Sequence, residues 1–321
     1  MAVNKSEYRI TICLPVYNAM PYLPEAVESI LRQTYDDFRL IIINDGSTDG
    51  SVNYFTSIKD RRVCIIHQEN RGLGATLNRS LDMCDTEFYA RMDADDVATP
   101  DRIAAQIEYL EAHPDVVMVG SQVDFLLERK IIQGHRMPLD HDKIVHSLML
   151  GCPAICHPSI MVRMSAIRRV GGYRIARSGQ DFDFWLRLAE AGQIANMDKV
   201  LLHYRIHMNS VVATKRDSIR CGKSYAIECA KCRAKGLPEP KYDDFRKRWM
   251  AQSSAWIRAR DFIESWSALQ YRKSLFHLAD GRVLSGYISL LPAMACRPRA
   301  SVNQIRLRVN SRFQKHQQTS P

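Results

Sequence analysis

Two acidic clusters follow short apolar runs, and their residue types suit the binding of a metal and a diphosphate. Residues 41–43 lead into Asn44-Asp45-Gly46-Ser47-Thr48-Asp49, and residues 88–92 lead into Asp93-Ala94-Asp95-Asp96. Carboxylates are hard oxygen ligands for divalent cations, and such a cation can in turn hold a diphosphate. Three carboxylates within four positions repel one another, and a bound cation relieves that repulsion. The sequence therefore predicts a site for a nucleotide and a divalent metal, Mn²⁺ or Mg²⁺.

A sheet has to position these clusters. Strand-like apolar runs occur at residues 10–14, 40–43, 63–67, 88–92 and 116–119, and they alternate with segments whose apolar residues recur every three or four positions. Repeated βα units predict a mostly parallel sheet covered by helices, in which ligands bind at the carboxyl ends of the strands. Thr99 followed by Pro100 predicts the N-cap and first residue of one helix.

The pattern changes in the second half of the chain. A strand pair and a helix are expected over residues 121–150, a short strand over 160–162, a helix from about Asp181 and a last strand over 200–205. From about residue 215 the sequence reads as helical and basic. We therefore predict an α/β domain of Rossmann-like units over residues 8–210 and a helical, basic region over 211–321.

The net charge of +10 is concentrated in that C-terminal region. Residues 211–321 hold 22 Lys and Arg against 8 Asp and Glu, so the rest of the chain is slightly acidic. This pattern fits either an appendage with a solvated basic face or a surface that contacts anionic lipid. No nucleic-acid recognition motif accompanies the charge, so nucleic acid is not an expected partner.

The nine cysteines form no disulfide framework, and their odd number favours reduced thiols. Cys229 and Cys232 make a C-x-x-C without a second pair at a spacing suited to zinc. The N-terminus lacks the features of a signal peptide, and no stretch has the ~18–20 apolar residues of a spanning helix. These features predict a cytoplasmic protein that could lie peripherally on the inner face of the cytoplasmic membrane.

The acidic cluster at residues 93–96 is open to three interpretations. Aspartates after a strand can cap the next helix. Alternatively, Asp93-Ala94-Asp95-Asp96-Val97 fits the D-x-D-x-[TV] pattern of haloacid-dehalogenase-type phosphatases, with Asp93 as nucleophile and Asp95 as general acid and base. That motif normally follows the first strand, whereas this one follows about the fourth.

The third interpretation takes in more of the chain, because residues 8–210 resemble the family 2 inverting glycosyltransferases, which have the nucleotide-sugar-binding GT-A fold. The motifs stand in the family's order: Leu14-Pro15-Val16-Tyr17-Asn18, Ser29-Ile30-Leu31-Arg32-Gln33-Thr34, Asn44-Asp45-Gly46-Ser47-Thr48-Asp49, Asn70-Arg71-Gly72, Asp93-Ala94-Asp95-Asp96, His157-Pro158-Ser159, Gln180-Asp181-Phe182-Asp183-Phe184-Trp185-Leu186-Arg187 and Tyr204-Arg205-Ile206-His207.

The resemblance implies roles on the donor side. Pro15 and Tyr17 would line the nucleoside pocket, and Asp45 would accept a hydrogen bond from a uracil-type ring NH, with an Asx turn as the structural alternative. The family usually has a carboxylate where Asn44 stands. The remaining implied roles are phosphate or carboxylate binding by Arg71, ribose or metal binding by Asp93, and metal binding by Asp95 and His207.

The resemblance also implies an acceptor side. Asp181 would be the base that takes the acceptor proton, with Asp183 as the fallback. His157 would lie in the acceptor-side loop, where a structural use is the alternative, and Trp185 would form part of the acceptor wall unless it is buried in the core.

The resulting expectation is a metal-dependent inverting glycosyltransferase that acts on a glycan or lipid-linked acceptor in surface polysaccharide biosynthesis. Its rivals are the phosphatase and a catalytically silent nucleotide- or glycan-binding module of the same fold.

Overall fold

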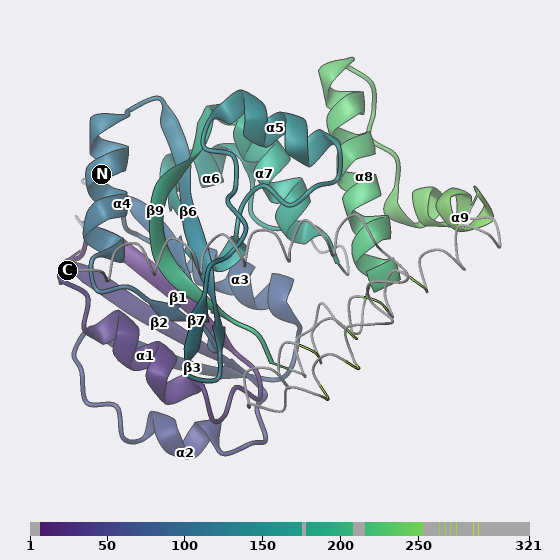
Figure 1. Ribbon diagram of the computed structural model, residues 1–321. Coiled ribbons are helices and arrows are strands. Elements are labelled where there is room, and N and C mark those ends of the chain that lie inside the picture. The colour runs from purple at the N-terminus through teal and green to yellow at the C-terminus, as the bar shows by residue number, and fades with distance from the viewer. Residues whose placement is uncertain are drawn as a thin grey trace, which may run out of the picture. The chain divides into compact units, whose positions relative to one another are not determined.

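The computed structural model describes residues 7–174, 178–207 and 216–252, together with six single positions between 263 and 288. The chain forms two compact units, residues 1–206 with 217–246 and residues 207–216 with 247–321. The sheet and the helices that pack on it lie in the first unit (Figure 1). The boundary predicted near residue 210 differs from this division, since residues 217–234, which are helical, belong to the first unit.

Within the part of the chain that the structure describes, nine strands form one sheet. They are β1 (Ile10–Val16), β2 (Phe38–Asp45), β3 (Val63–Gln68), β4 (Phe88–Arg91), β5 (Val97–Ala98), β6 (Val116–Leu127), β7 (Lys130–Ile132), β8 (Met161–Arg163) and β9 (Gln193–Arg205). Their order is β3-β2-β1-β4-β8-β6-β9-β5, with β7 paired to β6. The parallel pairing predicted from the βα units is present in β3-β2-β1-β4 and between β6 and β9, whereas β8, β5 and β7 pair antiparallel.

Helices cover both faces of the sheet. The described α-helices are α1 (Leu23–Leu31), α2 (Ser51–Phe55), α3 (Leu73–Asp82), α4 (Arg102–Ala112), α5 (His141–Met149), α6 (Met164–Val170), α7 (Gln180–Ala191), α8 (Arg216–Ala234) and α9 (Tyr242–Gln252). Because successive side chains of a strand point to opposite faces of the sheet, alternate residues pack against different helices. Ile12 and Leu14 pack with α1, α2 and α4, whereas Cys13 and Tyr89 pack with α3, α5, α6, α7 and α8.

The predicted start of α4 is wrong by two residues. The N-cap is Asp101 and not Thr99, whose hydroxyl donates a hydrogen bond to the Asp101 carboxylate at 2.8 Å. Pro100 therefore precedes the helix instead of opening it. Thr and Asp are both common N-cap residues, so the sequence alone does not show whether Thr99 or Asp101 precedes the first turn of the helix.

Among the described helices, none has the length and hydropathy needed to cross a membrane. The eight cysteines that the structure describes are all free thiols, and Cys229 is buried in α8.

Candidate functional site

Three carboxylates meet at the carboxyl end of β4. Oxygen atoms of Asp93, Asp95 and Asp96 lie within 4.8 Å of one another. One Asp96 oxygen accepts a hydrogen bond from the Arg205 amide at 2.8 Å, and the other is buried without a hydrogen-bond partner among the described residues. Burial raises the pKa of Asp96 well above its ordinary value, and the charges of Asp93 and Asp95 raise it further. A cluster of two partly exposed carboxylates and one buried carboxylate with an unsatisfied oxygen fits a divalent cation.

Arg91, the last residue of β4, is a site residue that sequence reasoning missed. Its side chain is 2% exposed and pairs with Asp93, while its Nε and one terminal nitrogen have no hydrogen-bond partner among the described residues. Burial raises the pKa of Asp93 and repulsion from Asp95 adds to this, whereas the Arg91 charge opposes both. An arginine inside an otherwise apolar strand was the one signal available in the sequence.

Asp45, at the end of β2, shapes the loop that carries Arg71. Its carboxylate accepts hydrogen bonds from the Arg71 amide at 2.8 Å, the Gly72 amide at 2.9 Å and the Gln68 side chain at 2.7 Å. The residue is only 4% exposed. Asp45 thus fixes the path of the chain from β3 into α3, and its contact with a nucleotide base stays a prediction.

The loops after β1 and β2 are joined to each other. Asn18 accepts a hydrogen bond from the Thr48 amide at 2.7 Å, and its own amide donates to the Ser47 hydroxyl at 3.0 Å. Pro15 lies in β1, which is buried along its whole length, whereas Tyr17 follows the strand and is 56% exposed. An exposed aromatic ring held next to two strand ends is suited to stacking on a base, so the nucleoside role of Pro15 and Tyr17 stays open as predicted.

Asn44 makes up for the carboxylate that the resemblance leads one to expect at its position. Its side-chain oxygen accepts a hydrogen bond from the Ser47 amide at 3.0 Å, and its nitrogen lies 3.1 Å from His67 Nδ1. The amide therefore holds the same turn without adding a charge.

Asp181 stands in the first turn of α7, where the helix N-terminus favours a negative charge. Its carboxylate accepts a hydrogen bond from the Phe182 amide at 2.9 Å. Burial raises its pKa above the ordinary aspartate value, while that amide and the charges of Lys223 and Arg91 oppose the shift. A partly buried carboxylate with a raised pKa has the character of a general base.

Asp183 has a different environment, although it lies only two residues further. It is 4% exposed, Arg187 donates a hydrogen bond to it through Nε at 2.9 Å, and a terminal nitrogen of Arg187 forms an ion pair with the same carboxylate at 2.8 Å. Arg187 also donates to the carbonyls of Val170, Gly171 and Gly172. Asp183 therefore ties α7 to the end of α6 and is poorly placed to receive a proton from a substrate.

His157 and Trp185 pack against each other on the same side of the sheet as Asp181. The His157 Nε2 lies 2.9 Å from the Tyr173 hydroxyl, and its ring meets the Trp185 ring edge to face at 5.9 Å. Burial, aided by the charge of Arg91, lowers the pKa of His157 well below its ordinary value, so the ring is neutral. Trp185 is 2% exposed. The core alternative for Trp185 is thus what the structure shows, and the acceptor-side role of His157 stays a prediction.

His207 follows β9 by two residues and belongs to the second unit of the chain. Its assignment as a metal ligand stays a prediction.

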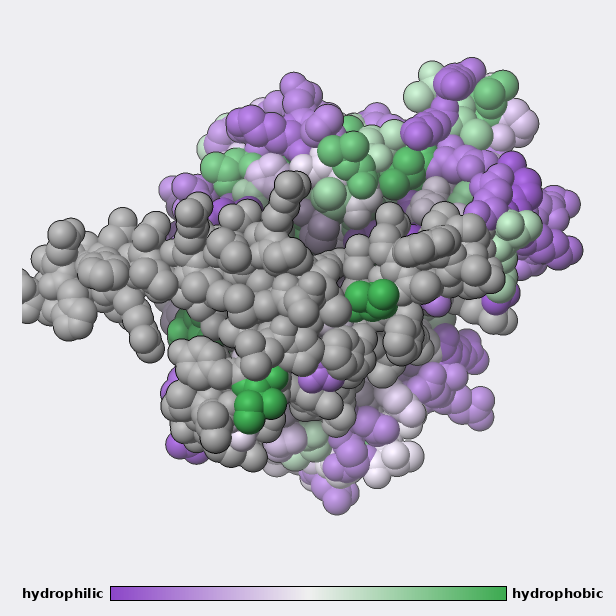
Figure 2. Space-filling model, turned by 45° about the vertical axis from the view of Figure 1, so that its right-hand side comes forward, coloured by the Kyte–Doolittle hydropathy of each residue, from purple (hydrophilic) through white to green (hydrophobic). Residues whose placement is uncertain are grey.

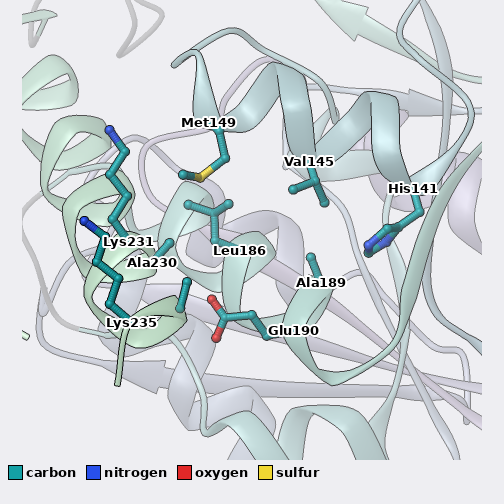
Figure 3. A pocket seen from close by; sticks show the side chains of 10 residues that line it. His141, Val145, Met149, Leu186, Ala189, Glu190, Ala230, Lys231 and Lys235 are labelled. Carbon is teal, nitrogen blue, oxygen red and sulfur yellow. The ribbon is translucent and has the colours of Figure 1, made fainter. Parts of the chain in front are cut away.

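A separate pocket of about 330 Å³ lies among α5, α7 and α8 (Figure 3). Its lining consists of His141, Val145, Met149, Leu186, Ala189, Glu190, Ala230, Lys231, Ala234 and Lys235. The α7 residues that line it come from the second half of the helix, whereas Asp181 stands in its first turn. The lining contains neither Asp181 nor any carboxylate of the cluster at the end of β4, so this pocket is distinct from both.

Similarity to known proteins identifies the family of this chain. Residues 11–171 match the family model described as Glycosyl transferase family 2. The chain belongs to this family. It is 32% identical over 226 residues to the O-antigen biosynthesis glycosyltransferase WbnJ of Escherichia coli, covering 68% of this chain and 87% of the relative. It is 30% identical over 242 residues to the putative glycosyltransferase EpsE of Bacillus subtilis, covering 73% and 85%.

Two solved structures have the same fold. One is TarS 1–349 of S. aureus in complex with UDP-GlcNAc, with a TM-score of 0.58, 15% identity and coverage of 88% of this chain and 90% of that one. The other is the mannosyltransferase PcManGT of Pyrobaculum calidifontis in complex with GDP-Man and Mn²⁺, with a TM-score of 0.53, 15% identity and coverage of 98% and 84%. The GT-A fold and the family 2 resemblance are confirmed, and the protein is a glycosyltransferase. The phosphatase alternative gains no support.

Proposed function

We propose that this glycosyltransferase moves a sugar from a nucleoside-diphosphate sugar to a hydroxyl of a glycan or lipid-linked acceptor, with inversion at the anomeric carbon. The observation that carries the proposal is the pairing of two acidic groups with different chemistry. Asp93, Asp95 and Asp96 form a ligand cluster, and Asp181 projects from a separate helix close enough for its charge to raise the pKa of Asp93. One group suits a diphosphate with its counter-ion, and the other suits proton removal.

Inversion follows from a single displacement with Asp181 as the base. The acceptor hydroxyl gives its proton to the Asp181 carboxylate while the acceptor oxygen bonds to the anomeric carbon. The bond from that carbon to the diphosphate oxygen breaks, and its electron pair leaves with the nucleoside diphosphate. General base catalysis of this kind contributes roughly 10²–10⁴-fold to the rate.

The carboxylate cluster supports a requirement for Mn²⁺ or Mg²⁺. Asp95, with Asp93 and Asp96 beside it, would hold the ion, and His207 is the further ligand that the sequence predicts. When bound, such an ion neutralises charge that develops on the departing diphosphate. Arg91 holds Asp93 in place from within the sheet, and Asp45 holds the loop of Arg71, whose guanidinium is suited to phosphate oxygens.

The relatives support surface polysaccharide biosynthesis as the setting. The E. coli relative is named for O-antigen biosynthesis. The donors seen with the two structural neighbours, UDP-GlcNAc and GDP-Man, mark UDP- and GDP-sugars as the first candidates for this chain.

Contact with anionic lipid on the inner face of the cytoplasmic membrane is the localisation that we infer from charge. Arg246, Lys247 and Arg248 are exposed on α9. On the face that Figure 2 shows, the described residues are mostly hydrophilic, with small hydrophobic groups among them. Exposed cations such as those on α9 favour electrostatic attachment, in which each cation near the membrane contributes about 1 kcal/mol.

A donor screen followed by product analysis tests the function. Thermal unfolding is measured with Mn²⁺ across UDP- and GDP-sugars, and the donor that stabilises the protein most is then incubated with the enzyme in water. NMR spectroscopy should show that the released sugar first appears with the anomeric configuration opposite to that of the donor. Retention of configuration would refute the single displacement. Stabilisation without turnover would favour the silent module, and release of phosphate from phosphomonoesters would favour the phosphatase.

A further inference from the structure

Helix α8 lies beyond the residues that match the family, yet it contacts the segment that presents Asp181. The contact is backbone against backbone. A Cβ added to Gly222 would come within 1.7 Å of the Ser178 carbonyl oxygen, and one added to Gly179 would come within 2.7 Å of the Gly222 carbonyl carbon. Only glycine allows such an approach, and Gly179 also has a φ of +81°. The Ser218 hydroxyl donates to the Ser178 hydroxyl at 2.9 Å beside this contact.

The residue that follows Gly222 faces the catalytic side. Lys223 Nζ lies 4.2 Å from the centre of the Phe182 ring, and Phe182 adjoins Asp181 in the first turn of α7. A cation over an aromatic face is held in place by the ring quadrupole. Because Gly222 allows the close approach of α8 and the Phe182 ring holds the ammonium, the Lys223 charge has a defined place from which it acts on the Asp181 carboxylate.

Four charged or titratable groups surround the Asp181 carboxylate. They are Arg91 from β4, Asp93 from the loop after β4, Tyr173 from the segment between α6 and α7, and Lys223 from α8. Lys223 acts on Asp181 more strongly than Arg91 does. Burial lowers the pKa of Lys223 below its ordinary value, and the charge of Asp181 opposes that shift. The charge of each group therefore favours the charged form of the other, against the effect of burial.

We propose that Lys223 is a positioning residue for the base of the transfer reaction, because α8 and the Phe182 ring hold its ammonium at the first turn of α7, where a positive charge favours a carboxylate at Asp181. The inference rests on the proposed function, because it assumes that Asp181 receives the acceptor proton. It also makes α8 a part of the catalytic unit, although the helix belongs by composition to the basic C-terminal third.

The test is the pH dependence of kcat/KM for Lys223→Met, Lys223→Arg and the parent. An opposite charge at close range shifts a carboxyl pKa by about 1–3 units. The acid limb of Lys223→Met should therefore move up by at least about one pH unit, which means a loss of about tenfold at a pH on the parent's limb and recovery at higher pH. Lys223→Arg should stay close to the parent. Lys231→Met, an exposed lysine on the same helix, is the matched control and should leave the profile unchanged.

A thermal-unfolding cycle of Lys223→Met, Asp181→Asn and the double variant at pH 8 measures the same pairing without turnover. Non-additive changes in Tm are expected, since residues that interact directly couple in such cycles. Superimposable pH profiles of Lys223→Met and an active parent, or additive changes in Tm, would overturn the Lys223 inference alone. A parent that transfers no sugar from any donor would instead overturn the proposed function.

Discussion

Replacing Asp181 and Asp183 in turn by Asn should separate catalysis from stability. The two residues lie in the same turn of α7, and the sequence offered both as the base. Asp183 and Arg187 are each 4% exposed and are joined by a hydrogen bond within an ion pair, so Asp183→Asn leaves a buried guanidinium without this counter-charge. Removing one partner of a buried pair costs about 3–5 kcal/mol.

The structure places Asp183→Asn near the lower end of that range, about 3 kcal/mol. Asn keeps one oxygen that can accept from Arg187, which also retains its bonds to three backbone carbonyls. For a domain of this size each kcal/mol lowers Tm by about 2–4 °C, so the expected loss is about 6–12 °C.

Asp181→Asn should behave in the opposite way. Burial raises the pKa of Asp181, so folding disfavours its ionised form, but the same charge supports the ammonium of Lys223. These two effects oppose each other, so Asp181→Asn should lower Tm by less than Asp183→Asn does. Transfer should fall at least ~10²-fold, because an amide takes no proton. Metal and donor binding should persist.

Scanning calorimetry and single-turnover transfer on both variants decide between the two roles. If Asp183→Asn kept the parent's Tm and lost transfer, whereas Asp181→Asn remained within a few-fold of the parent rate, the roles assigned here would be exchanged. Loss of donor binding together with activity in Asp181→Asn would show that the start of α7 organises the whole site.

Three further outcomes are expected. Asp95→Ala should abolish turnover and the Mn²⁺-dependent thermal stabilisation by nucleoside diphosphate, and undiminished stabilisation would show that the metal lies elsewhere. The kcat/KM of the parent should fall as the pH drops through a pKa above the ordinary aspartate value of 3.8, because burial raises the pKa of Asp181 and only its ionised form accepts a proton; a limb at the ordinary value would contradict this. Changing Arg246, Lys247 and Arg248 to Glu should weaken sedimentation with anionic vesicles, as high salt should in the parent, and a parent that does not bind vesicles refutes the lipid contact.

The donor side of the fold could be predicted from the sequence because its signals are local. Residues 10–45 and 88–96 carry apolar strands that run directly into Asp45 and the Asp93 cluster, and a parallel sheet brings their carboxyl ends together. The hydrogen bond from the Ser47 amide to the Asn44 side chain is also local, because the two residues are three positions apart. Strand periodicity and βα alternation are therefore sufficient to predict most of the donor side of the fold.

Arg91 and Lys223 could not be assigned in that way, because their roles depend on contacts across the chain. Arg91 reads as a charge that interrupts an apolar strand, and only the packing of β4 reveals that it is buried beside Asp93. Lys223 lies 42 positions after Asp181 in a segment whose composition reads as a solvated basic helix. The small residues that let α8 pack closely, Gly222, Ala226 and Ala230, give no periodic apolar signal strong enough to predict the contact.

The donor half of the site and the half that carries Asp181 come from different parts of the chain. The strand ends and loops that would handle the donor, from Pro15 to Asp96, lie within residues 11–171, which match the family model. The first turn of α7 and the helix α8 that supports it come after that stretch. A nucleoside diphosphate is chemically similar from one donor to the next, whereas the acceptor hydroxyl belongs to a different molecule in each enzyme. We therefore expect members of this family to share the first half of the site together with the carboxylate of the α7 motif, and to differ more in the segment that packs on that motif, which is α8 in this chain.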